Sequence, residues 1–309
     1  MPDAVSFDPF HPGERLAQEY VGVRERMAAR GGRFIREAMP EQHREFFGTL
    51  PFVAVATADH DGWPCGTLVS GTPGFITSPD PRTLQIGAAP VGEDPTGAAL
   101  IPGSGIGLLG IDFVTRRRNR ANGVLTHSGE RLLEVAVQQS FGNCAQYIQS
   151  REIVAGADVD APQLERLASI DDAAGKLIAS ADTFFVASAA GAAVDMSHRG
   201  GRPGFVRQDG DMLTIPDFSG NRYFNTFGNF LVSPRAGLLF VDFERGYLLH
   251  LSGEIEIVWD SNEVRQFAGA ERLWRVRLSH GWWLRGALPW RWIFRENAPT
   301  TERTGTWTA

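Results

Sequence analysis

The chain contains an internal repeat with a long period. Three short segments recur 130 residues further along: Pro73-Gly74-Phe75 as Pro203-Gly204-Phe205, residues 107–113 as 237–243, and Asn122-Gly123 as Ser252-Gly253. Matches at a single spacing over so much of a sequence are typical of a duplicated structural unit. We therefore expect two related domains in tandem, and we expect functional residues where the two copies differ.

Length and charge exclude several classes of protein. A chain of 309 residues can form two domains with a core each. Its formal charge of −6 argues against a nucleic-acid or anionic-membrane partner. No stretch approaches the roughly 20 apolar residues that span a bilayer. The first ten residues lack the basic and apolar regions of a secretory signal. We expect a cytoplasmic protein.

The two cysteines give no sign of a metal site or a disulfide framework. Cys65 and Cys144 lie in different segments, and neither belongs to a CxxC motif. Cys65 stands between Pro64 and Gly66, which indicates a turn. Cys144 is interpreted either as a thiol near a ligand or, more commonly for cysteine, as a small buried side chain.

The pattern of apolar residues predicts short strands with few long helices. Apolar residues at helical spacing from Leu16 to Met27 predict a helix that ends at Gly31-Gly32. Further helices are expected at 40–48 and 171–181, and strands at 52–57, 83–86, 108–113, 123–126, 184–188, 212–215, 238–243, 247–259 and 274–278. This pattern is typical of a barrel or sandwich. Residues 152–162, rich in Ala, Gly and Asp, are the predicted linker.

The two copies differ most in an insert of equal length, at 87–106 in the first and 217–236 in the second. The second insert is dense in hydrogen-bonding side chains: Ser219, Asn221, Arg222, Asn225, Thr226 and Asn229. At the matching positions the first insert has only one of them, the threonine Thr96. The first carries Glu93 and Asp94 instead. A phosphate needs several converging donors and at least one guanidinium, so only the second copy is suited to one.

The segment that precedes the insert differs in the same sense. Residues 197–202 of the second copy read Ser-His-Arg-Gly-Gly-Arg, whereas the matching residues 67–72 carry no charge. Glycines in such a loop allow the backbone to approach a ligand closely. Each of these residues alone is more often part of a turn or a solvated surface. Together, and in one copy only, they predict an anion site in the second copy and a degenerate first copy.

Four segments resemble motifs of a known family. They are residues 139–148, 195–205, 215–229 and 233–240, which read QSFGNCAQYI, DMSHRGGRPGF, IPDFSGNRYFNTFGN and SPRAGLLF. They resemble the pyridoxamine 5′-phosphate oxidase-like flavoproteins, and in particular the branch with two barrels in one chain. The resemblance spans about residues 35–295.

This resemblance implies a mainly β fold with flanking helices (α+β), in which two tandem FMN-binding split β-barrels form a pseudo-dimer. The implied domains are a helical extension at 1–38, a first barrel with a degenerate phosphate site at 39–155, and a second, phosphate-binding barrel with a Trp-rich tail at 163–309. In that tail Trp282, Trp283, Trp290 and Trp292 are interpreted as packing across a barrel end or an oligomer interface, or else as a lid over the site.

The resemblance also implies FMN at the seam between the barrels. The residues matched to cofactor binding are Ser197, His198, Arg199, Pro216, Asp217, Ser219, Asn221, Arg222, Asn225 and Asn229. Residues 142–144 would cover the flavin from the other side of the seam. Relatives often carry Pro-Lys after the Asn-Cys pair, where this chain has Ala145-Gln146 and so lacks a cation. With Glu93 and Asp94 in the mirrored site, we expect one FMN per chain or none.

The implied activity is that of an FMN-dependent oxidoreductase on an unidentified small substrate, with NAD(P)H or a partner reductase as electron donor. No acid–base pair identifies catalytic residues. Two alternatives stay open, because fold does not determine function. One is a protein that binds flavin, haem or deazaflavin without turnover, with His198 or His250 as the candidate haem ligand. The other is a module that serves a partner reductase. An oligomer is compatible with each of them.

Overall fold

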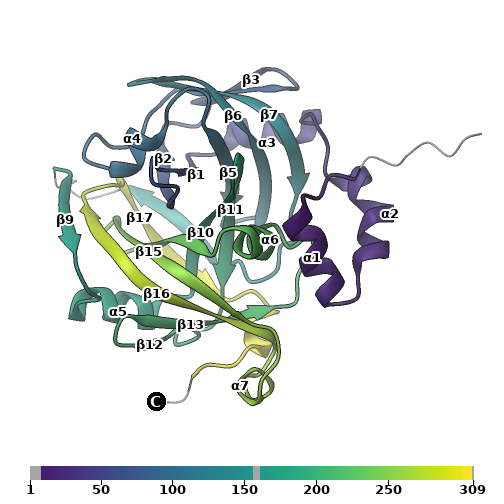
Figure 1. Cartoon of the computed structure of the whole chain (residues 1–309). Coiled ribbons are helices and arrows are strands. Elements are labelled where there is room, and N and C mark those ends of the chain that lie inside the picture. Colours follow the sequence, from purple (N-terminus) through teal and green to yellow (C-terminus); the bar gives the residue numbers. More distant parts are fainter. Residues whose placement is uncertain (1–7, 156–160, 308–309) are drawn as a thin grey trace, which may run out of the picture.

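The computed structural model describes residues 8–155 and 161–307, and it consists mainly of two antiparallel sheets of the same design (Figure 1). The first sheet contains β1 (Phe52–Ala58), β2 (Pro64–Ser70), β3 (Ile76–Asp80), β4 (Thr83–Ile86), β5 (Gly105–Asp112), β6 (Arg117–Gly129) and β7 (Leu132–Gly142). The second contains β10 (Thr183–Ala190), β11 (Ala193–Gly200), β12 (Arg207–Asp209), β13 (Met212–Phe218), β14 (Arg235–Asp242), β15 (Tyr247–Val258) and β16 (Ala270–Arg285).

Both sheets have the same strand order. The order is β2-β1-β5-β6-β7-β4-β3 in the first and β11-β10-β14-β15-β16-β13-β12 in the second, so each strand occupies the place of its counterpart. The starts of β5 and β14 lie 130 residues apart, as do those of β6 and β15. The predicted fold of two tandem split β-barrels is therefore confirmed.

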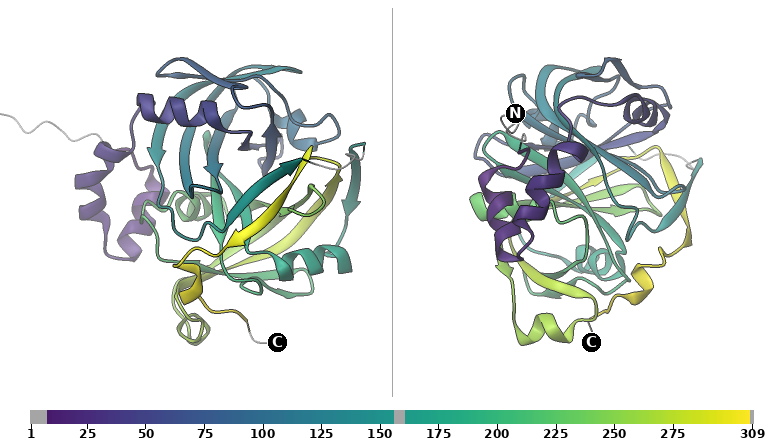
Figure 2. Two further views of the ribbon diagram at one scale, coloured as in Figure 1. Left: turned by 180° about the vertical axis from the view of Figure 1, so that it is seen from behind. Right: turned by 90° about the vertical axis from the view of Figure 1, so that its right-hand side faces the viewer.

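Helices and short strands complete each half. The helices are α1 (Pro12–Tyr20), α2 (Arg24–Phe34), α3 (Glu41–Thr49), α4 (Pro95–Ala99), α5 (Asp172–Ser180), α6 (Asn225–Val232), α7 (Asn262–Gln266) and the 3-10 helix η1 (Thr301–Arg303). β9 (Gln163–Leu167) pairs with β16, and β8 (Ser150–Ala155) pairs with β17 (Trp290–Glu296). Figure 2 shows the first half stacked on the second, with α1 and α2 at one side. Within the described residues, no helix is long and apolar enough to cross a membrane.

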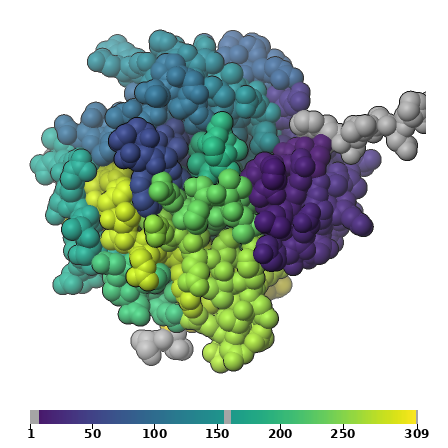
Figure 3. Space-filling model, viewed as in Figure 1, coloured from purple at the N-terminus to yellow at the C-terminus, as the bar shows by residue number. Residues whose placement is uncertain are grey.

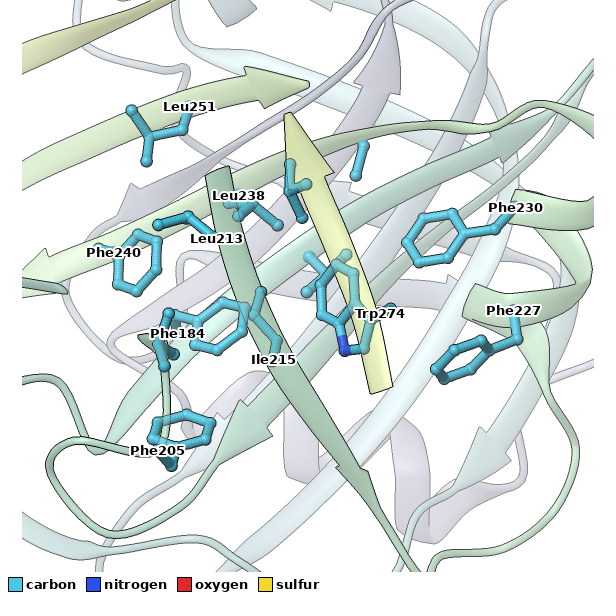
Figure 4. Packing of buried hydrophobic residues seen from close by; sticks show 14 of the residues in the cluster. Phe184, Phe205, Leu213, Ile215, Phe227, Phe230, Leu238, Phe240, Leu251 and Trp274 are labelled. Atoms are coloured by element: carbon cyan, nitrogen blue, oxygen red, sulfur yellow. The ribbon is translucent and has the colours of Figure 1, made fainter. Parts of the chain in front are cut away.

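Buried aromatic side chains fill the second barrel (Figure 4). Trp274 on β16 is fully buried and lies within 6.4 Å of the rings of Phe184, Phe227 and Phe230. Burial of one such side chain contributes roughly 1.5–3 kcal/mol. This cluster supports the inner face of β13 and the start of α6, so the elements that carry the predicted anion site rest on a packed core.

The barrels meet along a seam that explains why glycines recur in the repeat. A Cβ on Gly107 of β5 would lie 2.8 Å from the Cα of Asp195 in β11. A Cβ on its counterpart Gly237 of β14 would lie 2.4 Å from the carbonyl oxygen of Pro64 in β2. Each glycine thus lets a strand of the opposite barrel approach closely. The repeat preserves a contact between the barrels as well as a fold.

Three local predictions were wrong. The N-terminal helix breaks at Gly22, whose φ of 66° ends α1, and Gly31 lies inside α2, where a Cβ would meet the Phe10 ring at 2.5 Å. Residues 152–155 of the predicted linker belong to β8, while 156–160 lie outside the described residues. Cys65 is a buried residue of β2 and not part of a turn. Of the tail tryptophans, Trp282, Trp283 and Trp292 are buried, which agrees with packing.

Candidate functional site

A cavity opens at the seam and takes its walls from both halves of the chain. Nine of the ten predicted cofactor-binding residues line it, and Asn229 does not. The residues that sequence reasoning missed or left without a role include Arg118 and Arg120 on β6, Gln146 and Tyr147 after β7, and Glu271 and Arg272 on β16. The predicted Asn143 and Cys144 also line the cavity. Cys144 is exposed, which contradicts its interpretation as a buried side chain.

Arginine dominates the charge of the cavity. Five arginines line it, against the two carboxylates of Asp217 and Glu271. Arg199 and Arg272 both donate to Asp217, and Glu271 accepts from Arg272 at 3.0 Å and from Arg222 at 2.5 Å. Three guanidinium groups therefore share two carboxylates, and the lining keeps a net positive charge before Arg118 and Arg120 are considered.

Arg120 joins the two barrels behind the cavity. It donates to the Asn225 side-chain oxygen at 2.8 Å and to the Ser197 hydroxyl at 2.6 Å, and it lies 3.1 Å from the Asp195 carboxylate. Burial lowers the pKa of Arg120, and the carboxylate of Asp195 opposes this effect. A cation of the first barrel thus orients polar groups of the second.

Arg118 and His198 form a pair whose proton positions follow from the chemistry of arginine. Arg118 Nη1 lies 2.9 Å from His198 Nδ1, and a guanidinium can only donate. His198 Nδ1 is therefore the acceptor, and the ring proton is on Nε2. Burial, followed by the charge of Arg118, lowers the pKa of His198 well below its usual value, so the ring is neutral. Burial lowers the pKa of Arg118 to about 9, which leaves it cationic at neutral pH. Across residues 8–155 and 161–307, Arg118 makes no ion pair with a carboxylate.

Many buried donors around the cavity have no acceptor in the described part of the chain. They are the Nε atoms of Arg118, Arg120, Arg199 and Arg272, together with His198 Nε2 and Asn143 Nδ2. Each unsatisfied buried polar group costs roughly 1–3 kcal/mol. Because the excess is on the donor side, the cavity is suited to a ligand rich in acceptor oxygens.

The N-terminus of α6 faces the same cavity and has no side-chain cap within the described residues. The side chain of its N-cap residue Phe224 has no acceptor, and Asn225, Thr226 and Phe227 of the first turn line the cavity. Free N–H groups and the helix dipole favour an anion at such an end.

Backbone strain is concentrated at the cavity. Four described residues other than glycine have positive φ, and three of them, Tyr147, Arg222 and Phe224, line it. Such conformations cost on the order of 1–3 kcal/mol and occur preferentially at ligand sites.

The mirrored position at the other side of the seam has different chemistry. Leu248 and His250 of β15 stand where β6 carries Arg118 and Arg120. His250 is buried and stacked on Trp282 at 4.9 Å, and burial lowers its pKa. Asn229 lies one turn beyond Asn225 on the same face of α6, where it donates to Ser188 at 3.0 Å and lines a separate cavity together with Asn225.

No protein-family model matches the chain, and no curated protein matches it. Among solved structures, a variant of HupZ from group A Streptococcus is 15% identical, with 37% of this chain covering 99% of that one at a TM-score of 0.31. A putative pyridoxamine 5′-phosphate oxidase from Lactobacillus delbrueckii is 18% identical; the match covers 34% of this chain and 95% of that one, at a TM-score of 0.28. An FAD-binding protein from Mesorhizobium loti is 10% identical; the match covers 39% of this chain and 97% of that one, at a TM-score of 0.29. At these identities the likeness is one of fold alone.

Proposed function

We propose that the seam cavity binds FMN and that the protein is an FMN-dependent oxidoreductase acting on a small substrate. The observation that carries this proposal is the set of buried donors without acceptors around a net positive cavity. A phosphate supplies acceptor oxygens and negative charge together, and a flavin ring adds further acceptors along one edge. Three of the four sequence segments that resemble FMN-binding proteins, 139–148, 195–205 and 215–229, line this same cavity.

The residues suggest how the cofactor would be held. The uncapped N-terminus of α6, with Arg199, Arg222 and Ser197 beside it, would hold the phosphate. Arg118 and Asn143 from across the seam, and His198 Nε2 from the second barrel itself, would donate to the ring. The cavity encloses about 120 Å³, less than the roughly 300 Å³ at which ligand pockets begin. It suits a phosphate-sized group, and the ring would extend through the open mouth.

Two half-buried aromatic side chains in the lining suit a flat ring. Tyr147 of the first half and Phe218 of the second lie 5.3 Å apart, and both line the cavity. When bound, FMN supplies hydride and electron transfer, and the protein provides binding, orientation and electrostatics. Here the cation of Arg118 would favour the gain of electrons by a ring beside it.

The geometry favours flavin over haem. A haem ligand needs a ring nitrogen free of its proton, but Arg118 occupies His198 Nδ1 and thereby keeps the proton on Nε2. His250, the other candidate, stacks on Trp282 and does not line the seam cavity. The alternative is a protein that binds flavin without turnover. Reduction of the bound flavin by an electron donor distinguishes the oxidoreductase from this alternative.

The first experiment is an absorbance spectrum of the purified protein after addition of FMN and removal of the excess. We expect flavin bands at about one FMN per chain, followed by bleaching when NADPH, NADH or a reductase is added without oxygen. A protein that stays colourless would overturn FMN binding. If FMN binds but no donor reduces it, the alternative of a flavin-binding protein without turnover is supported, and the proposed oxidoreductase activity is excluded.

A double substitution tests the position of the phosphate. Arg199→Ala with Arg222→Ala removes two guanidinium groups, each of which contributes roughly 1.5–3 kcal/mol through charged hydrogen bonds. We expect FMN affinity to fall about 100-fold or more, while riboflavin, which has no phosphate, changes much less. Arg202→Ala, on an exposed arginine of the adjacent loop, is the control. If the double variant retains FMN through gel filtration, the phosphate lies elsewhere.

A further inference from the structure

The N-terminal helix α1 lies directly behind the helix whose N-terminus faces the cavity. Figures 1 and 3 show α1 against the second half of the molecule, beside α6. The two helices cross where Gly13 meets Gly228: a Cβ on Gly13 would lie 2.1 Å from the Gly228 carbonyl oxygen. A Cβ on Gly228 would in turn lie 2.6 Å from the Glu14 backbone nitrogen. The contact is thus as close as two helix backbones allow.

This close contact lets Glu14 reach the site from behind. Glu14 is only 4% exposed, and its carboxyl accepts from the His11 backbone at 2.8 Å and from the Asn225 side-chain nitrogen. The Asn225 side-chain oxygen faces the other way and accepts from Arg120 at 2.8 Å. An amide satisfies both partners in only one orientation. Glu14 therefore fixes the rotamer of a residue that lines the cavity.

Gln18, one turn further along α1, holds the strained loop before α6. It is fully buried and donates to the backbone oxygen of Tyr223 at 3.1 Å. Tyr223 lies between Arg222 and Phe224, the two residues of this loop with positive φ. The Phe10 ring packs against that of Tyr223 at 5.8 Å. Strained backbone persists only where its surroundings hold it, and here the N-terminal segment does so.

We infer that α1 is a built-in clamp for the anion end of the cavity, with Glu14 and Gln18 as positioning residues for Asn225 and for the loop 219–224. The inference rests on the proposed function for the identity of the ligand, which is the phosphate of FMN. Neither residue lines the seam cavity, so the effect passes through Asn225 and the Tyr223 backbone. The N-terminal extension is then part of the binding site and not an appendage to it.

The test compares Glu14→Ala, Glu14→Gln and Gln18→Ala with Glu19→Ala, which removes an exposed glutamate from the same helix. Dissociation constants for FMN and riboflavin are measured by fluorescence quenching on the full chain. Loss of one buried hydrogen-bond partner predicts FMN binding roughly tenfold weaker for Glu14→Ala. Riboflavin affinity should be unchanged. Glu14→Gln keeps an acceptor for Asn225 and should restore FMN affinity.

Hydrogen–deuterium exchange of residues 219–226, without ligand, separates failure of the clamp from failure of the FMN proposal. Faster exchange in Glu14→Ala and Gln18→Ala, but not in Glu19→Ala, supports the clamp even if the unsubstituted protein binds no FMN. Unchanged exchange in both variants overturns it. Equal losses of FMN and riboflavin affinity in Glu14→Ala would also overturn it, because they indicate a general structural role.

Discussion

The two copies of the barrel place a short helix at the same point of the fold and use its N-terminus in opposite ways. In the first copy Asp94 caps α4, since its carboxylate accepts from the Thr96 backbone at 2.9 Å. In the second copy the equivalent residue is Phe224, and α6 begins without a side-chain cap among the described residues. In the first copy the Asp94 carboxylate occupies the helix N-terminus, whereas in the second copy no side chain caps the N-terminus within the described residues. On the proposed function, this difference would keep the anion site in the second copy and close it in the first.

The difference extends to what lies on either side of each helix. α6 faces five arginines in the seam cavity and has α1 behind it. α4 packs on β1 and β2 of its own barrel, and Leu248 and His250 replace two of the arginines at the mirrored site. The five arginines, the uncapped helix N-terminus and the supporting helix α1 thus occur together at one of the two mirrored sites.

The largest effect is expected when the second copy is given the acidic residue of the first. Phe224→Asp would place a carboxylate beside the first turn of α6, where its charge would repel a phosphate. Aspartate also tolerates the left-handed backbone at this position better than most residues. We expect FMN affinity to fall about 100-fold or more, measured by fluorescence titration.

Phe224→Asn is the matched control, because it removes the same ring without adding charge. Loss of the buried aromatic ring lowers stability in both variants by a similar amount, on the order of 3 kcal/mol. If the aspartate and asparagine variants bound FMN equally well, a carboxylate at the N-terminus of α6 would not exclude the phosphate, and the explanation of the difference between the copies would be wrong.

A second prediction concerns pH and the helix behind α6. Burial raises the pKa of Glu14 to about 8, against the hydrogen bonds from His11 and Asn225, which lower it. Between its ordinary value of 4.5 and about 8, the folded state therefore keeps a proton that the unfolded chain has released. The free energy of unfolding should fall as pH rises through this window, by up to about 1.4 kcal/mol per pH unit from this group.

Glu14→Gln isolates that contribution, because glutamine resembles the protonated acid and does not titrate. The difference in unfolding free energy between the variant and the unsubstituted protein should grow in favour of the variant from pH 5 to pH 8. Urea denaturation at several pH values measures it, and contributions from other groups cancel in the difference. A difference independent of pH would mean that Glu14 is ionised in the folded protein.

Much of this site could be predicted from sequence because its residues lie in two short segments. Ser197 to Arg199 and Pro216 to Asn225 belong to motifs whose counterparts at the 130-residue spacing contain no arginine and carry Glu93 and Asp94, so the contrast was visible without a structure. The same repeat predicted that the two halves would share one fold, but it did not predict the strand order. Asn229 does not line the seam cavity because it lies one helical turn beyond Asn225, where the same face of α6 borders a separate cavity.

The missed residues act across contacts that no local pattern reveals. Arg118 and Arg120 are two residues apart in a basic run, so in a strand their side chains lie on the same face. Only the packing of the two barrels against each other brings that face to the second barrel. Arg272 lies opposite Asp217 through the pairing of β13 with β16. Glu14 is separated from Asn225 by 211 residues. The periodicity of apolar residues from Leu16 to Met27 predicts a helix but does not indicate which element the helix packs against.

The smallest expected effect is in the first copy, where Asp94→Ala removes the cap of α4. Loss of an N-cap costs about 1 kcal/mol of stability, so the chain should unfold at slightly lower urea concentration. FMN binding should keep its affinity and its ratio of one per chain, because the mirrored site still lacks the arginines that line the other. A second FMN bound by this variant would show that the cap alone closes the first copy. The arginines across the seam would then contribute less to the difference between the copies than the helix N-terminus does.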